Sequence, residues 1–225
     1  MTAPRWVRRG PGVVGEGYAI MVPRGWVQIP GRLRPETAFD AVVDQLGSVL
    51  GGEVPPEFAQ RVGSGLIEAR AADAAGSVLD SFVTAGPLPG TGTTASVVVS
   101  VVPVTPRSSD DLDRLLLGRV ARGATALGVG GEPAVVWDDS LGHGPPRASS
   151  GRVVRRRTAL SRVTGRLDRL ASATLTVLED SEGDPAPSIP REDHEAVADA
   201  LVGLFDAMLT TVRWLDAEGR VVTDR

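Results

Sequence analysis

The sequence contains no cysteine, no lysine and no asparagine. Without cysteine the chain can form no disulfide, thiolate nucleophile, iron–sulfur cluster or cysteine-ligated zinc site. Without lysine it can form neither a Walker-type phosphate loop nor a Schiff base nor a Ser-x-x-Lys acylation site. The absence of asparagine removes every N-glycosylation acceptor. Codon bias in a GC-rich genome explains the missing lysine and asparagine, and the exclusions hold whatever the cause.

Long apolar runs and a strong net charge are also missing. The longest apolar stretch, Ala95–Val104, is short and is interrupted by serine and proline, whereas a membrane-spanning helix needs about 20 apolar residues. The first 17 residues carry arginine but no apolar run of the kind that a signal peptide needs. With 24 basic and 28 acidic side chains, the whole chain does not attract nucleic acid or an anionic membrane. We expect a soluble cytoplasmic protein with no nucleic-acid partner and no membrane insertion.

The length of 225 residues suits a single domain. Residues 1–17 combine charge, proline and glycine without periodicity, which indicates a flexible N-terminal arm. A single domain is expected over residues 18–215, followed by a polar C-terminal tail over residues 216–225.

Strands dominate the middle of the chain, and helices lie before, between and after them. The helices are expected from Pro35 to Gly51-Gly52, from Pro56 to about Ala75, from an N-cap at Ser109, and around an apolar stripe at Val197, Leu201, Leu204, Phe205 and Met208. The strands are expected at Tyr18–Val22, Trp26–Ile29, Ser77–Thr84, Ala95–Val104, Ala134–Trp137, Arg152–Val163 and Leu167–Leu178. Because there is no regular alternation of strand and helix, the pattern predicts an α+β fold with an antiparallel sheet flanked by helices.

The order of these landmarks resembles the PsbP-like (Mog/PsbP) superfamily. The opening YAIMVPRGWVQI is similar to that family's start, a strand, a Pro-x-Gly-Trp turn and a second strand. The closing LVGLFDAMLTTVRW is similar to its terminal helix, and the likeness would cover Tyr18 to Leu215. The resemblance implies an antiparallel sheet and a mostly non-enzymatic, protein-binding role. It supplies no catalytic residues.

Two glycine-rich strings have some features of phosphate or dinucleotide sites. The string Gly10–Gly15 matches G-x-G-x-x-G, but it follows an unstructured lead and precedes a strand, whereas a dinucleotide site opens a helix. The string Gly86–Thr94 lacks the lysine of a phosphate loop and also precedes a strand. Neither string predicts a cofactor site, and we expect no cofactor.

Both histidines lie near carboxylates. Asp138, Asp139 and His143 could together hold a divalent cation or transfer a proton, or they could form a solvated turn. His194 lies among acidic residues in the first turn of the last helix, which suits a surface ion pair. No G-x-S-x-G string accompanies either histidine.

An arginine-rich segment precedes an acidic one. Residues 147–169 contain eight arginines and one acid, and residues 179–199 contain eight acids and one arginine. The candidate partner-binding residues are Arg152, Arg155, Arg156, Arg157 and Arg162. In a strand, Arg155 and Arg157 point to one face and Arg156 to the other. The segment therefore either binds an acidic partner or pairs internally with the acidic segment.

Three hypotheses about function follow. The first is a non-catalytic protein-binding module, an adaptor or chaperone-like accessory of a bacterial secretion system. The second is a metal-dependent or acid/base enzyme centred on Asp138, Asp139 and His143. The third is a self-associating structural subunit, in which an exposed valine-rich strand such as Ala95–Val104 pairs across a homodimer.

Overall fold

The computed structural model describes residues 5–8, 17–31, 33–52, 54, 77–88, 91–105, 108–139, 152–179 and 191–222. The helices are α1 (Pro35–Leu50), α3 (Ser109–Val120) and α4 (Arg191–Thr211). The strands are β1 (Arg5–Arg8), β2 (Gly17–Val22), β3 (Trp26–Pro30), β4 (Val78–Thr84), β5 (Thr93–Pro103), β6 (Thr125–Val129), β7 (Glu132–Asp138), β8 (Arg152–Val163), β9 (Arg166–Glu179) and β10 (Arg213–Leu215). The expected helix Pro56–Ala75, the string Gly10–Gly15 and His143 lie outside the described residues.

The strands form two sheets. One has seven strands in the order β3-β4-β5-β9-β8-β7-β6, and the other has three in the order β1-β2-β10. Every pairing between described strands is antiparallel. The expected α+β class with an antiparallel sheet is therefore confirmed.

The valine-rich strand β5 lies in the middle of the large sheet. It is hydrogen-bonded to β4 on one side and, over its whole length, to β9 on the other. The expectation that Ala95–Val104 is an exposed strand free to pair across a dimer is wrong, because both of its backbone edges are already used.

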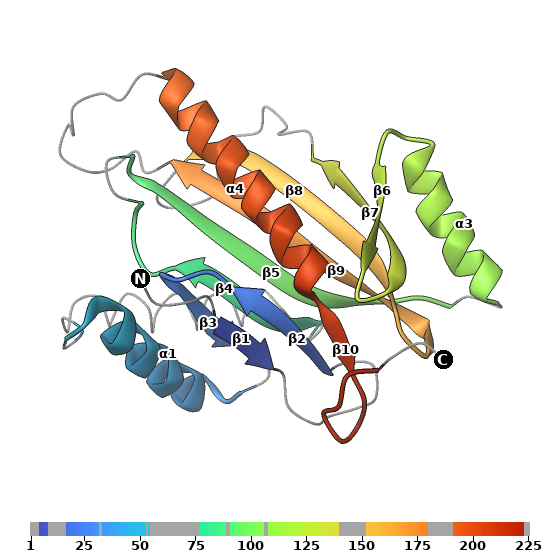
Figure 1. Cartoon of the computed structure of the whole chain (residues 1–225), viewed down its shortest axis with the longest axis horizontal. Helices are drawn as coiled ribbons and strands as arrows, with labels where there is room; N and C mark the ends of the chain where they lie inside the picture. Colours follow the sequence, from blue (N-terminus) through green and yellow to red (C-terminus); the bar gives the residue numbers. More distant parts are fainter. Residues whose placement is uncertain are drawn as a thin grey trace.

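Helix α4 crosses the front face of the large sheet, over the long strands β5, β9 and β8 (Figure 1). The main core lies between this helix, the sheet and β2 of the small sheet. Every second residue of the long strands faces the front and is buried, namely Ala95, Val97 and Val99 of β5, Leu175 and Val177 of β9, and Ala159 of β8. The residues of α4 that face the sheet are buried as well, namely Leu201, Phe205 and Met208. The alternation of apolar and polar residues, from which the strands were predicted, thus places the apolar residues on the buried face of the sheet.

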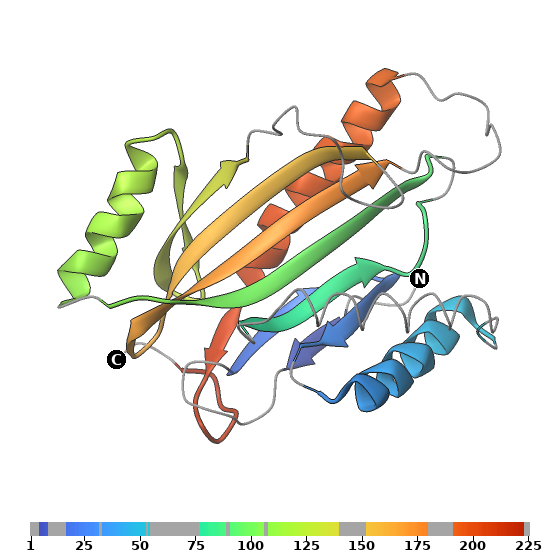
Figure 2. The ribbon, with the colours of Figure 1, turned by 180° about the vertical axis from the view of Figure 1, so that it is seen from behind.

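The rear face of the large sheet is covered at its two ends (Figure 2). At one end α1 packs Val42 and Leu46 against Val27 of β3. At the other, α3 packs Leu116 against Val135 of β7. Between them the rear residues of β5, β9 and β8 are half-buried and rich in hydroxyls, namely Ser96, Ser100, Ser172, Thr174, Thr176 and Thr158.

The helix boundaries follow their capping signals. Helix α1 has proline at its first position and ends at Gly51, which adopts the left-handed conformation with a φ of 73°. Helix α3 begins after an N-cap at Ser108, one residue before the expected Ser109. The backbone N–H of Ser108 donates to Oδ2 of Asp111 at 3.1 Å. No helix in the described ranges is long and apolar enough to cross a membrane.

The structure corrects the expectation of a flexible arm for residues Arg5–Arg8. These residues form β1, which pairs with β2 and buries Val7 in the main core. β1 has four residues and a single inward-facing apolar side chain, which is too little alternation for the sequence to predict a strand. Within the expected polar tail, Val221 forms a β-bridge with Leu215 at the end of β10, and the backbone N–H of Asp216 donates to the Arg220 carbonyl at 2.9 Å.

Candidate functional site

Several arginines of the β8–β9 hairpin form ion pairs within the molecule. On the α4 side, Nη2 of Arg155 donates to Oδ1 of Asp199 at 2.7 Å. Arg157 donates through Nε and Nη2 to the two carboxylate oxygens of Asp206, both at 3.0 Å, and through Nη1 to Asp138 at 3.0 Å. Helix α4 therefore supplies acidic partners to Arg155 and Arg157. Of these partners, Asp199 belongs to the acidic segment 179–199, whereas Asp206 lies beyond it.

These contacts change the ionisation of the arginines. The hydrogen bond from Arg155 to Asp199 raises the pKa of that guanidinium above its ordinary value, against a smaller opposing effect of burial. Burial by itself would lower the pKa of Arg157, but its bonds to Asp206 and Asp138 together outweigh burial and raise it. Both guanidiniums are therefore charged at neutral pH.

The remaining candidate arginines do not join them on one surface. Arg162 lies on the α3 side, where its Nη1 donates to Asp113 at 3.2 Å and its Nε lies 3.6 Å from Glu132. Arg156 is exposed, and its side chain has no hydrogen-bond or ion-pair partner among the described residues. The side chain of Arg152 lies outside the description. Because strand alternation divides the set between two faces, it does not form a single basic patch.

The two aspartates of the enzyme hypothesis have structural partners. Asp138 accepts from Arg157, while Asp139 accepts from Nε1 of Trp137 at 2.7 Å and from Oγ1 of Thr158 at 2.6 Å. The described residues contain no group of three potential metal ligands. The ring nitrogen Nδ1 of His194 lies 3.5 Å from Glu179, as a pair between α4 and the end of β9.

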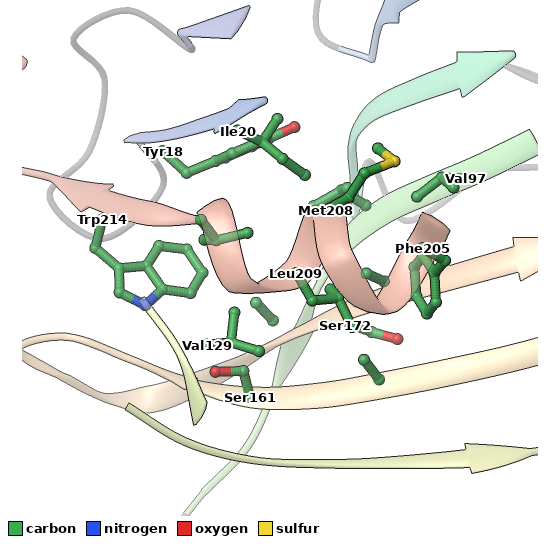
Figure 3. Close-up of a pocket in the computed structure, with 15 residues that line it drawn as sticks. Tyr18, Ile20, Val97, Val129, Ser161, Ser172, Phe205, Met208, Leu209 and Trp214 are labelled. Carbon is green, nitrogen blue, oxygen red and sulfur yellow. The ribbon is translucent and has the colours of Figure 1, made fainter. Parts of the chain in front are cut away.

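A small cavity lies under α4 in the main core (Figure 3). Its volume is about 30 Å³, and its lining is almost entirely apolar, with Phe205, Met208 and Trp214 among the residues around it. A space of this size holds about one water molecule. It is a gap in core packing, too small for a substrate.

An open groove of about 550 Å³ lies between the β2–β3 turn and the end of α1. Arg5 and Arg24 line it together with Trp26 and Val49. Arg5 is already bound, because its Nη2 donates to the Trp26 carbonyl at 3.2 Å and to Gln45 at 2.6 Å. The groove has no described group that could act as a nucleophile with a base beside it.

The sheet edges differ in how their backbone groups are used. At the β3 edge, Oε1 of Gln45 accepts from the Gln28 N–H at 3.0 Å, and Nε2 donates to the Gln28 carbonyl at 3.0 Å. One side-chain amide thus occupies both positions that a neighbouring strand would use. In the small sheet, the edge strand β1 carries two arginines. At the other edge the chain folds back beside β10, where Val221 forms a β-bridge with Leu215 and the Val222 N–H donates to the Trp214 carbonyl. Such devices prevent unwanted pairing at an edge.

The remaining edge, β6, is open. Gly130 and Gly131, with φ of 61° and 86°, form the two-residue turn that joins β6 to β7. In such a hairpin the closing residues Val129 and Glu132 exchange hydrogen bonds, and alternate residues along β6 face β7. The backbone groups of Ala126 and Gly128 therefore point away from the sheet, and no described side chain bonds to them.

The side chains of this open edge are small and uncharged. β6 has the sequence TALGV, without charge or proline, and Thr125, Ala126 and Gly128 are exposed. The helix α3, which packs on the adjacent strand β7, exposes Leu115 and Leu117 to 48% and 63% on the two flanks of the buried Leu116. An uncharged edge strand with outward backbone groups is typical of a site that pairs with another polypeptide.

The sequence interpretation missed this site. The segment Thr125–Val129 contains two small residues and no aromatic, so its alternation is weak. A usable signal was the pair Gly130-Gly131 directly before Ala134–Trp137, since a Gly-Gly pair between two short runs predicts a hairpin.

No protein-family model matches the chain, and no curated protein matches it. One solved structure that resembles it is described as the immunity protein TplEi of the T6SS from Pseudomonas aeruginosa, complexed with "L" peptide. The likeness covers 93% of this chain and 98% of that chain, at 14% identity and a TM-score of 0.27. A TM-score of that size does not establish a shared fold, and the interpretation of this chain rests on its own residues.

Proposed function

We propose that the protein is a non-catalytic protein-binding module that takes up an extended polypeptide segment at β6. The observation that carries this proposal is the difference between the two edges of the seven-stranded sheet. At β3 the outward backbone groups of Gln28 are bonded to Gln45, whereas at β6 those of Ala126 and Gly128 have no partner among the described residues. An added strand would satisfy these groups by main-chain hydrogen bonds.

The arginine hairpin has a structural role in this proposal. Arg155 and Arg157 hold α4 against β8, so their charge is not available to an acidic partner in the way that a free basic surface would be. Membership of the PsbP-like superfamily, and the adaptor or chaperone-like role in secretion that it implies, remain predictions. Strand addition at an open edge is a mechanism that such a role could use.

Site-specific photo-crosslinking in the native cell tests the proposal. A photoreactive amino acid at position 126 is expected to crosslink to a polypeptide, and the added substitution Gly128→Pro is expected to remove the crosslink by deleting an outward N–H. The matched control places the same photoreactive residue at Arg156, which is exposed and has no described partner. Crosslinks that survive Gly128→Pro, or that form at position 156 alone, would contradict binding at β6.

A further inference from the structure

We propose that the polypeptide that pairs with β6 is β6 of a second copy of this chain, so that two molecules join their sheets through a two-fold axis. This inference rests on the proposed function, because it names the partner of the same edge. Three properties of the edge support it: its register, its size and charge, and the charges of α3.

The register of β6 is complementary to itself. The outward-facing residues are Ala126 and Gly128, which lie symmetrically on either side of Leu127. In an antiparallel pair centred on Leu127, Ala126 of one copy exchanges both backbone hydrogen bonds with Gly128 of the other, and the reverse exchange occurs by symmetry. A two-fold axis through Leu127 therefore satisfies every outward backbone group of these residues in both copies.

The side chains of β6 permit this approach. On the rear face Ala126 of one copy would lie opposite Gly128 of the other, and both are small and exposed. On the front face the half-buried Leu127 would meet its own symmetry mate. Since β6 carries no charged residue, the pair brings no like charges together, in contrast to the protected arginine-bearing edge β1.

The two ends of α3 carry exposed charges of opposite sign. Asp110 lies in its first turn and Arg122 lies just after its end. Between them Asp111 is paired with Arg114 and Asp113 with Arg162, and Arg119 lies over the ring of Trp137. A two-fold axis perpendicular to the joined sheet keeps both α3 helices on the rear face and makes them antiparallel. The acidic beginning of each helix then lies on the side of the basic end of the other, which favours pairing of like molecules.

Sedimentation over several orders of magnitude in protein concentration tests the pairing. The wild type is expected to form a dimer, and Gly128→Pro is expected to weaken it by at least about tenfold because it removes an outward N–H that the monomer does not use. Ala126→Ser keeps that backbone group and is expected to dimerise as the wild type does. A dimer of unchanged affinity in Gly128→Pro would overturn the proposal.

A charge exchange gives a second test that does not alter the strand. Asp110→Arg and Arg122→Asp are each expected to weaken self-association, and an equimolar mixture of the two variants is expected to recover it, because each α3 then meets an opposite charge. Equal association of all three samples would contradict the antiparallel placement of α3.

Amide hydrogen exchange separates failure of this inference from failure of the proposed function. In a dimer the amides of Ala126 and Gly128 are expected to slow as concentration rises, while the amide of Leu127, bonded to β7, stays constant as an internal reference. A monomer at all concentrations with fast exchange at both positions overturns the dimer and leaves the edge open to another partner. A monomer with slow exchange at both positions overturns the dimer and the open edge together.

Discussion

Neighbouring arginines on β8 have different roles because the strand alternates its side chains between faces. Arg157 points toward α4 and forms a two-bond contact with Asp206 and a further bond with Asp138, and its side chain is only 15% exposed. Arg156 points away and is exposed. Their adjacency in the sequence therefore says little about shared function.

Arg157→Gln is expected to lower the free energy of unfolding by about 2 kcal/mol, because it leaves two carboxylates without their charged donor. Arg156→Gln, the matched control, is expected to change it by less than about 0.5 kcal/mol. Chemical denaturation of both variants measures the difference. Equal losses in the two variants would mean that Arg156 has a partner as strong as that of Arg157.

Gly130→Ala is expected to lower the free energy of unfolding by about 3 kcal/mol. Position 130 has a φ of 61°, and a Cβ there would lie 2.7 Å from Cδ1 and Nε1 of Trp214, so the substitution adds a clash to backbone strain. Gly165→Ala is the control, since its φ of 72° imposes the strain with no atom within 4 Å, at a cost of about 1 kcal/mol. Thermal unfolding followed by tryptophan fluorescence distinguishes them, and equal costs would remove the role assigned to Trp214.

Among the elements, α1 both covers the rear face and closes a sheet edge. Val42 and Leu46 pack against β3, and Gln45, between them on the helix, bonds to the backbone of Gln28. The same helix thus buries apolar surface and prevents β3 from pairing with another strand.

Gln45→Leu is expected to destabilise the protein by about 1 kcal/mol and to speed exchange of the Gln28 amide, because that N–H and its carbonyl lose their partner. Asp44→Ala, an exposed neighbour on α1, is expected to leave both measurements unchanged. Native-state hydrogen exchange by NMR provides the readout. Unchanged protection at Gln28 in Gln45→Leu would show that the edge is closed by something else.

At the scale of the whole molecule, the two sheets share a core and are joined by a buried polar contact. The Tyr18 hydroxyl of β2 donates to Oδ2 of Asp80 at 2.7 Å, and Nε2 of Gln28 donates to Oδ1 at 3.0 Å. This contact joins the small sheet to strands β3 and β4 of the large one. Asp80 is only 1% exposed, so each bond to its carboxylate matters more than one at the surface.

Tyr18→Phe is expected to cost about 2 kcal/mol, because it leaves a buried carboxyl oxygen without this donor. Unfolding is expected to remain a single transition, because α4 packs against both sheets. Circular dichroism and tryptophan fluorescence, followed in the same denaturant series, should therefore coincide for wild type and variant. Separate transitions by the two probes would show that the sheets unfold independently.

Much of the fold could be predicted because its elements have strong local signals. The apolar stripe of α4, the proline and glycine that bound α1, and the alternation in β5 and β9 each follow from side-chain periodicity and capping. β1, β6 and β10 were missed, since each has at most five residues and too few alternations to stand out. The equally short β3 was predicted because a Pro-x-Gly turn precedes it.

The candidate site was not predicted, because an open edge is a property of strand order. The composition and periodicity of the sequence determined the class of the fold, the face that each long element buries and the chemistry that the chain lacks. Only the tertiary structure decided that β5 is central and β6 is outermost, and that Arg155 and Arg157 are paired with α4. These features depend on contacts between residues far apart in the chain, which local periodicity does not encode.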